Sequence, residues 1–349
     1  MRLLVTGGAG FIGSHYVRTL LQGGYAGHAA GYADAEVTIY DKLTYAGNLA
    51  NLEPVATHPG YRFVQGDIID ARLLDEVLPG HDAVLNFAAE THVDRSILGA
   101  ADFVVTNVLG AQTLFDACLR ADVPRVVHIS TDEVYGSIAN GSFRETDPLL
   151  PNSPYSAAKA GGDLLARAYA VTHGLNVSIT RCTNNYGPYH FPEKVIPLFV
   201  TNLLDGQPVP LYGDGLNVRD WLHVDDHCRG IQLVLERGEP GEIYNIGGGT
   251  ELTNRELTER LLTACGRDAS FITYVEDRKG HDRRYSIDGA KLAALGYAPR
   301  IDFERGLADV VVWYREHRDW WEPLKGRAAL PGAPAAMAAM AAPAAAGAR

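Results

Sequence analysis

The stretch VTGGAGFIGS (Val5–Ser14) follows an apolar run that begins at Leu3 and leads into an amphipathic segment, Ile12–Leu21. Its glycines have the GxxGxxG spacing and are Gly7, Gly10 and Gly13. Glycines at a strand-to-helix turn let the backbone approach a pyrophosphate, and the N-terminus of the following helix offers unpaired N–H groups. A flexible glycine-rich turn without a ligand is the alternative. The position of the motif between a strand and a helix favours a dinucleotide-binding site.

Short β-rich runs alternate with helical stretches through the first half of the chain. The expected strands are 2–7, 36–41, 61–67, 82–89, 125–131 and 176–182, and two of the expected helices are 12–21 and 108–121. Strands with a continuous apolar character are typical of a parallel sheet that helices cover on both faces. We therefore predict an α/β fold built on a Rossmann-type doubly wound parallel sheet.

Beyond about Asn184 this alternation loosens, and proline, glycine and aromatic residues become denser. The change predicts a smaller α/β C-terminal lobe for the substrate, to which IYNIGGG (243–249) and a helix at Asn254–Cys265 contribute. We expect the dinucleotide-binding domain at 1–183, with a return segment at about 216–248, and the lobe at 184–327. Residues 328–349 are rich in alanine and proline and have little to bury, so we expect a disordered tail.

The composition excludes several classes of protein. A formal net charge of -11 over 349 residues argues against a general nucleic-acid or membrane-surface binder. We expect neither a signal peptide nor a membrane span. The four cysteines are widely spaced and include no CxxC pair, so we expect no metal site and no disulfide framework. Free thiols favour a cytoplasmic protein.

Asp41 ends the second expected strand. A carboxylate at this position can accept hydrogen bonds from both hydroxyls of an adenosine ribose and would repel a 2′-phosphate, although Lys42 could soften that repulsion. We therefore expect NAD rather than NADP. Asp67, in the GDI triplet, is placed either to meet the adenine amino group or to cap its own loop.

The stretch PYSAAKAGGD (154–163) contains Tyr155 and Lys159, which share one face of a helix if Ser153 caps it and Pro154 is its first residue. A lysine ammonium beside a phenol, together with a positive nicotinamide ring, would lower the pKa of Tyr155 so that it acts as a base at neutral pH. The YxxxK pattern also occurs by chance on surface helices. After a glycine-rich nucleotide site, we favour the catalytic interpretation.

Two carboxylates, Asp132 and Glu133, stand side by side in ISTDEVYGS (129–137), directly after an expected strand. They either cap a turn or form an acid–base pair. In a semi-buried site, crowding of two carboxyl groups raises the pKa of one of them, which then stays protonated at neutral pH.

The glycine motif, Asp41, STDEVYG (130–136) and YSAAK (155–159) together resemble the extended short-chain dehydrogenase/reductase family. The resemblance continues to about Arg327 through the stretches 41–52, 88–96, 184–197, 212–226 and 280–288. Within the family, Asp132 with Glu133 resembles the members that dehydrate a nucleotide hexose. Epimerases and decarboxylases usually have Ser or Thr and small residues before VYG.

The resemblance implies an NAD-dependent hydro-lyase that acts on dTDP-glucose, by C4 oxidation, loss of water across C5 and C6, and hydride return to C6. It implies that Tyr155 is the base at O4, that Glu133 is the base at C5 and that Asp132 is the acid at the C6 hydroxyl, with Thr131 as a hydrogen-bonding partner of O4. It also implies a homodimer. The rivals are an epimerase or decarboxylase, against which Asp132–Glu133 argues, and an NAD-sensing protein without activity, which typically lacks the tyrosine or the lysine.

The resemblance further implies which residues hold the two ligands. The expected cofactor contacts are Gly7, Gly10, Phe11, Ile12, Gly13, Asp41, Lys42, Leu43, Thr44, Asp67, Ile68, Ala88, Ala89, Thr106, Tyr155, Lys159 and Asn184. The expected substrate contacts are His92, Thr131, Asn185, Lys194, Val195, Pro210, Tyr212, Arg219, Asn254, Arg278, His281 and Tyr285. An acidic chain needs a local cationic pocket for a diphosphate, for which Arg219 and Arg278 are candidates, although either alone could be a solvated charge.

Overall fold

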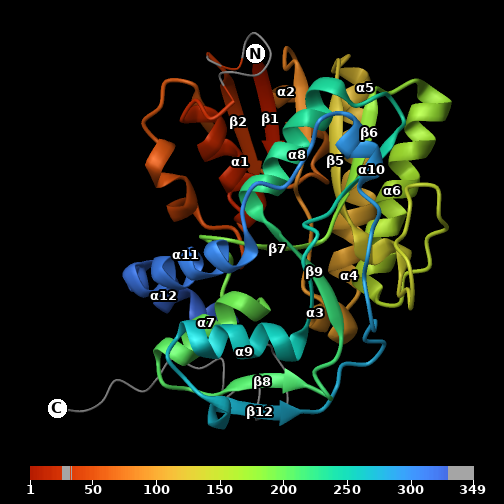
Figure 1. Cartoon of the computed structure of the whole chain (residues 1–349). Coiled ribbons are helices and arrows are strands. Elements are labelled where there is room, and N and C mark those ends of the chain that lie inside the picture. The colour runs from red at the N-terminus through yellow and green to blue at the C-terminus, as the bar shows by residue number, and fades with distance from the viewer. Residues whose placement is uncertain (26–31, 33, 329–349) are drawn as a thin grey trace.

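The computed structural model describes residues 1–25, 32 and 34–328; the tail expected at 328–349 lies outside them, apart from Ala328. A parallel sheet forms the centre of the upper part of the molecule in Figure 1, with the strand order β10-β6-β5-β4-β1-β2-β3. Its strands are β1 (Arg2–Thr6), β2 (Glu36–Asp41), β3 (Tyr61–Gln65), β4 (Ala83–Asn86), β5 (Val126–Thr131), β6 (Val177–Cys182) and β10 (Ile243–Ile246). All neighbouring strands pair in parallel, which confirms the Rossmann-type sheet.

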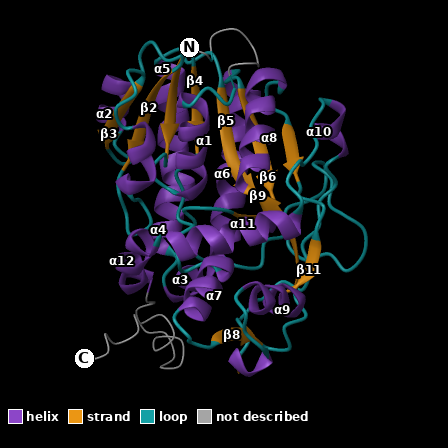
Figure 2. Cartoon of the chain, turned by 60° about the vertical axis from the view of Figure 1, so that its left-hand side comes forward, coloured by secondary structure: helices purple, strands orange, loops and turns teal. Residues whose placement is uncertain are grey.

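Helices cover both faces of this sheet, as Figure 2 shows. On one face α1 (Phe11–Leu21) and α8 (Val224–Arg237) pack apolar side chains against the strands. On the other face α2 (Ala71–Val77), α5 (Ala111–Arg120) and α6 (Pro154–His173) do the same. Because both faces are covered, β5 is buried at every position, including its polar residues His128, Ser130 and Thr131.

The expectation that 243–249 contributes to the second lobe is wrong. Residues Ile243–Ile246 form β10, which pairs with β6 at the edge of the large sheet. The apolar pattern of a short strand fits either sheet, and the choice is made by α8, which packs on the large sheet and returns the chain to β6. The return segment therefore contains α8 and β10, whereas β9 (Val218–His223) joins a small sheet with β7 (Asn184–Tyr186) and β11 (Glu251–Thr253).

The smaller lobe occupies the lower part of Figure 1. It contains α7 (Val195–Leu204), α9 (Asn254–Ala264), α11 (Phe303–Glu316), α12 (Arg318–Ala328) and a parallel pair, β8 (Val209–Tyr212) with β12 (Ile272–Val275). Its apolar core includes Phe199, Leu257 and the fully buried Trp321. The expected helix at 254–265 is confirmed as α9, which starts with a capping box between Thr253 and Glu256.

The remaining short elements connect these layers. They are η1 (Leu49–Val55), α3 (Val93–Leu98), α4 (Ala101–Val104), the π-helical segment η2 (Val105–Gly110), η3 (Asp132–Tyr135), η4 (Ala269–Phe271) and α10 (Ala290–Ala294). Gly162 lets α6 approach η2 closely, because a Cβ there would lie 2.7 Å from the carbonyl oxygen of Asn107. Within the residues that the structure describes, no helix combines the length and apolar character needed to cross a membrane.

Candidate active site

A cavity of about 460 Å³ lies at the carboxyl ends of the central strands of the large sheet and continues into the smaller lobe. In open α/β sheets this edge is where ligands bind. Every residue predicted to contact the cofactor or the substrate lines it, except Leu43. Leu43 has a φ of 57° and packs its side chain against the core of the large sheet. It shapes the turn after β2 and does not face the cavity.

The glycine-rich turn leaves room only for backbone at the start of α1. Gly7 has a φ of 64°, and a Cβ there would lie 2.6 Å from the amide nitrogen of Ala88. A Cβ at Gly13 would lie 2.5 Å from the carbonyl oxygen of Gly7. These close approaches exclude larger residues and keep the first turn of α1 open to the cavity, so the turn fits a pyrophosphate.

Asp41 lies at the end of β2 and is buried. Its Oδ2 accepts a hydrogen bond from the N–H of Ala9 at 2.9 Å, and its Oδ1 accepts one from Leu43 at 2.8 Å. Burial raises the pKa of Asp41, and these N–H groups oppose the rise. Each oxygen keeps a free lone pair, so the carboxylate can still accept from a vicinal diol.

Lys42 is paired across the cavity with Asp67, with 3.4 Å between Nζ and Oδ2. Its ammonium also donates to Thr106 Oγ1 at 3.2 Å. Asp67 in turn accepts from the N–H of Ile69 at 3.2 Å, so this residue caps its loop and also lines the cavity. Lys42 is therefore engaged by a carboxylate and offers less positive charge to a 2′-phosphate than its sequence position suggests.

Helix α6 begins as predicted, with Ser153 as its cap and Pro154 as its first residue. The cap places Tyr155 and Lys159 on the cavity side of the helix, and the Lys159 ammonium donates to the carbonyl oxygen of Ile129 at 2.7 Å. Burial raises the pKa of Tyr155 well above its usual range, and the Glu133 carboxylate adds to the rise. The lowering expected from Lys159 together with the positive nicotinamide ring concerns the protein with its cofactor bound, and it stays a prediction.

Asp132 and Glu133 form the first turn of η3, which Thr131 caps by accepting from the N–H of Glu133 at 3.2 Å. Asp132 is 2% exposed, and its Oδ2 has no hydrogen-bond partner among the described residues. Burial raises the pKa of Asp132 well above its usual range, with Glu133 and Asp220 as further causes. The predicted rise is present, but burial contributes more to it than crowding does.

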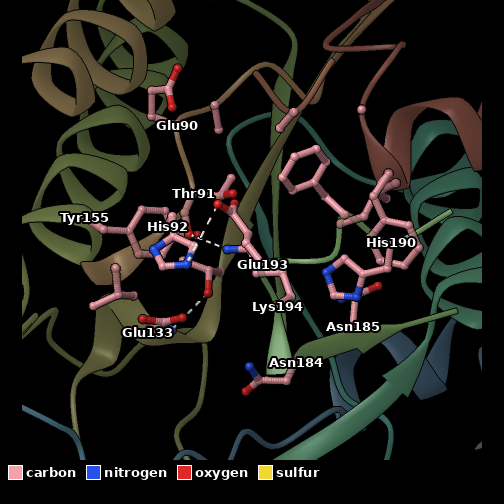
Figure 3. A pocket seen from close by; sticks show the side chains of 18 of the residues that line it. Glu90, Thr91, His92, Glu133, Tyr155, Asn184, Asn185, His190, Glu193 and Lys194 are labelled. Carbon is pink, nitrogen blue, oxygen red and sulfur yellow. Dashed lines mark hydrogen bonds and ion pairs between the residues drawn. The ribbon is translucent and has the colours of Figure 1, made fainter. Parts of the chain in front are cut away.

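Glu133 lies near Tyr155 in Figure 3, on the wall of the same cavity. Burial raises the pKa of Glu133, whereas the positive charges of Arg219, Lys194 and Arg278 oppose the rise. The neighbouring carboxyl groups are thus in different electrostatic surroundings. Asp132 favours the protonated form, and Glu133 receives the support of cations, which is the division that an acid and a base require.

Three cations gather at the end of the cavity formed by the smaller lobe. Arg219 is buried, donates to the carbonyl oxygen of Asp282 at 3.0 Å and lies over the ring of Tyr285 at 4.2 Å. Lys194 donates to the carbonyl oxygen of Thr91 at 2.8 Å, a contact visible in Figure 3. The third is Arg278. All three line the cavity, and their role toward a diphosphate stays a prediction.

Three more of the predicted substrate contacts form hydrogen bonds with neighbouring side chains. His281 Nδ1 lies 2.6 Å from Asp277 Oδ1, and the hydroxyl of Tyr285 donates to Asp282 at 2.7 Å. The side-chain oxygen of Asn185 lies 2.9 Å from His227 Nδ1. The others that line this end are His92, Val195, Pro210, Tyr212 and Asn254. In the described part of the chain no cluster of His, Cys, Asp and Glu could hold a metal ion.

The protein-family model described as GDP-mannose 4,6 dehydratase matches residues 4–310. The chain belongs to this family. It is 61% identical over 335 residues to a dTDP-glucose 4,6-dehydratase of Streptomyces antibioticus, which covers 96% of this chain and 98% of the relative. It is 64% identical to the crystal structure of DesIV, a dTDP-glucose 4,6-dehydratase from Streptomyces venezuelae with NAD and TYD bound, with a TM-score of 0.91 over 93% of this chain and all of that one.

The fold of the family does not by itself decide the reaction. A UDP-glucose 4-epimerase from Thermotoga maritima has a TM-score of 0.82 at 31% identity, over 90% of this chain and 99% of that one. Within such a shared fold the reaction is set by the side chains of the site.

Sequence reasoning missed Glu193 and Asp94 as members of the site. The Glu193 carboxylate accepts hydrogen bonds from the hydroxyl of Tyr45 at 2.8 Å and from Arg95 Nε at 3.2 Å. Burial raises the pKa of Glu193, and nearby cations oppose the rise. A charged residue beside Lys194 and between apolar neighbours was the available signal, since such a carboxylate needs buried partners.

Proposed function

We propose that this chain catalyses the NAD-dependent dehydration of dTDP-glucose to dTDP-4-dehydro-6-deoxyglucose. The observation that carries the proposal is the pair Asp132–Glu133 beside Tyr155 in one cavity, in a member of a 4,6-dehydratase family. An epimerase needs a base at O4 but no acid for a leaving hydroxyl. The product would enter the biosynthesis of deoxysugars or rhamnose.

The residues at the large-sheet end of the cavity fit NAD. The turn at Gly7–Gly13 and the first N–H groups of α1 would hold the pyrophosphate, and Asp41 would accept from the adenosine ribose. The Asp41 carboxylate and the engaged Lys42 disfavour a 2′-phosphate. NAD, when bound, accepts hydride from C4 of the sugar and returns it to C6.

The side chains of this protein would move the protons. Tyr155 takes the proton of the C4 hydroxyl as C4 becomes a ketone, with Thr131 hydrogen-bonded to the same oxygen and Lys159 beside it. The ketone makes the C5 proton acidic, so Glu133 would remove it and return a proton to C5 when hydride reaches C6. Asp132, whose pKa burial raises, would donate a proton to the departing C6 hydroxyl, so that water leaves.

The two ends of the cavity suggest a division of labour. We propose that residues 1–183, with the return segment at about 216–248, hold NAD, and that 184–327 hold the nucleotide sugar. Arg219, Arg278 and Lys194 would meet the diphosphate, since guanidinium groups bind phosphate in a bidentate manner and an ammonium adds a point charge. The four free cysteines support a cytoplasmic location.

We further propose that the chain forms a homodimer through η2 and α6. Large apolar side chains are exposed on these neighbouring helices, with Leu109 at 49%, Leu164 at 58% and Val171 at 73%. Isologous dimers bury such a surface against its own copy.

The deciding experiment compares dTDP-glucose and UDP-glucose as substrates. A dehydratase converts dTDP-glucose to a 4-keto sugar, which absorbs light after treatment with alkali, and regenerates NAD in each turnover. Formation of dTDP-galactose would instead establish an epimerase. Binding of NAD without any product would establish a protein that only senses the cofactor.

A further inference from the structure

A buried ionic cluster adjoins Lys159 outside the cavity lining. Asp163 lies one helical turn beyond Lys159 on α6 and is 1% exposed. Arg181, on β6, donates from Nε to Asp163 Oδ2 at 2.8 Å. His128, on β5, places Nε2 at 3.7 Å from Asp163 Oδ1. The proposed dehydration assigns no role to these three residues.

The cluster is costly, and its packing alone does not explain it. Burial of an ion pair often stabilises a fold less than apolar residues of the same volume would. Here the pair is also incomplete, because Asp163 Oδ1 and Arg181 Nη1 have no hydrogen-bond partner among the described residues. Oδ2 of Asp163 therefore accepts a hydrogen bond from Arg181, whereas Oδ1 accepts none from the described residues.

The charge of Asp163 also acts on Lys159. Residues four apart on a helix have neighbouring side chains, so the carboxylate of Asp163 follows Lys159 on the same face. Burial lowers the pKa of Lys159, and Asp163 is the first group that opposes the decrease. The other titratable or charged groups around Lys159 are Tyr155 on α6, Cys182 and Arg181 on β6, and His128 on β5.

His128 does not compete for the same role. Burial lowers its pKa well below the usual range, and the Lys159 charge adds to that effect, so the ring stays neutral. Arg181 is paired with Asp163 and lies over the ring of Tyr135 at 4.7 Å. Asp163 is thus the carboxylate of this cluster whose charge can balance a buried ammonium.

We propose that Asp163 is a positioning residue that keeps Lys159 protonated beside Tyr155, and that Arg181 holds the carboxylate of Asp163 in place. The value of a protonated Lys159 to the reaction rests on the proposed dehydratase function. The ionisation of Lys159 itself is a property of the folded chain, and it can be measured without any sugar substrate.

The test is an NMR titration of protein labelled with ¹³C at the lysine Cε, whose chemical shift follows ionisation of the amine. The signal that disappears in Lys159→Arg belongs to Lys159. In Asp163→Asn its titration midpoint falls by about 1 pH unit or more, which is the order of shift that a nearby opposite charge produces. The matched control is Asp116→Asn on α5, which removes a carboxylate bonded to Tyr169 of α6 and leaves the midpoint unchanged.

The conservative variant Asp163→Glu restores the charge and returns the midpoint toward that of the unsubstituted protein, which a purely structural role would not require. If an unpaired Arg181 prevents Asp163→Asn from folding, the double variant Asp163→Asn, Arg181→Gln removes both charges and still shows the lower midpoint. An unchanged midpoint in either folded variant overturns the proposal. A lowered midpoint in a protein that fails to dehydrate dTDP-glucose supports the role of Asp163 and contradicts the proposed function instead.

Discussion

Arg278 donates hydrogen bonds to both carboxylate oxygens of Asp94, at 2.7 and 2.8 Å, and so joins the smaller lobe to helix α3. Both residues line the cavity, and 184 positions separate them in the chain. The pair fixes the plane of the guanidinium before any ligand arrives. Preorganisation of this kind lowers the entropy cost of binding a diphosphate.

The first prediction follows from this pair. Asp94→Asn removes the negative charge that holds the guanidinium of Arg278 in one orientation. The KM for the nucleotide sugar should therefore rise about tenfold, or about 1.4 kcal/mol, with little change in kcat. The control is Glu251→Gln, which weakens a bidentate pair with Arg284 outside the cavity. Equal kinetic effects of both substitutions would show that Asp94 has no special role toward the substrate.

The second prediction separates the roles of the carboxyl groups. Glu133→Gln should leave C4 oxidation intact and slow elimination by about 100-fold or more, the usual effect of a lost base. Enzyme-bound NADH should then accumulate, and exchange of the C5 hydrogen with solvent deuterium should cease. In Asp132→Asn that exchange should continue while water loss is slow, and Tyr155→Phe should form no NADH. Normal turnover by Glu133→Gln would refute this division.

The third prediction concerns NAD. Asp41→Ala should weaken NAD binding by about 1–3 kcal/mol, because the ribose hydroxyls and the N–H groups of Ala9 and Leu43 lose a charged acceptor. Titration calorimetry measures the affinity directly. Asp41→Asn, which keeps the shape and one acceptor oxygen, should lose less, and an unchanged affinity in Asp41→Ala would remove Asp41 from the cofactor site.

The fourth prediction concerns stability against pH. The pKa of Asp132 is raised in the folded protein from an ordinary value of 3.8, so the folded state binds its proton more tightly than the unfolded state does. This contribution to stability is present below the unfolded pKa and is lost as pH rises toward the folded pKa. Asp132→Asn should therefore gain stability relative to the parent between pH 4 and pH 7, by about 1 kcal/mol or more. Denaturant unfolding at both pH values measures the difference, and a constant difference would contradict the raised pKa.

The fifth prediction concerns assembly. Leu164→Asp places a charge on the exposed apolar face of α6 and should shift the protein from dimer to monomer in sedimentation velocity experiments. Leu150→Asp is the control, since Leu150 is similarly exposed, at 65%, but lies in the loop before α6. Dissociation by both variants, or by neither, would place the interface elsewhere.

The large sheet and the start of each site element were predictable because their signals are local. The glycine turn, the end of β2 at Asp41 and the cap of α6 at Ser153 each depend on a few consecutive residues. The orientation of Leu43, in the turn after β2, could not be predicted from the sequence. The positive φ of this residue turns its side chain away from the cavity.

Contacts between distant segments could not be predicted from the sequence. Lys42 meets Asp67, and Glu193 meets Tyr45 across 148 positions, so neither partner is visible in a local pattern. Burial is likewise a property of the whole fold, so the sequence did not indicate that burial raises the pKa of Tyr155 in the protein without its cofactor.

The contacts of Glu193 have a consequence for how the cofactor is handled. This buried carboxylate bonds to Tyr45, which follows β2, and to Arg95, whose guanidinium lies 4.0 Å above the Tyr45 ring and also donates to the carbonyl oxygen of Arg327 in α12. Segments from both ends of the described chain therefore meet beside the cavity, and their contacts join the turn after β2 to α12. Because the proposed reaction restores the oxidised cofactor in every cycle, it requires no exchange of NAD, and contacts that slow the release of the cofactor would not slow turnover.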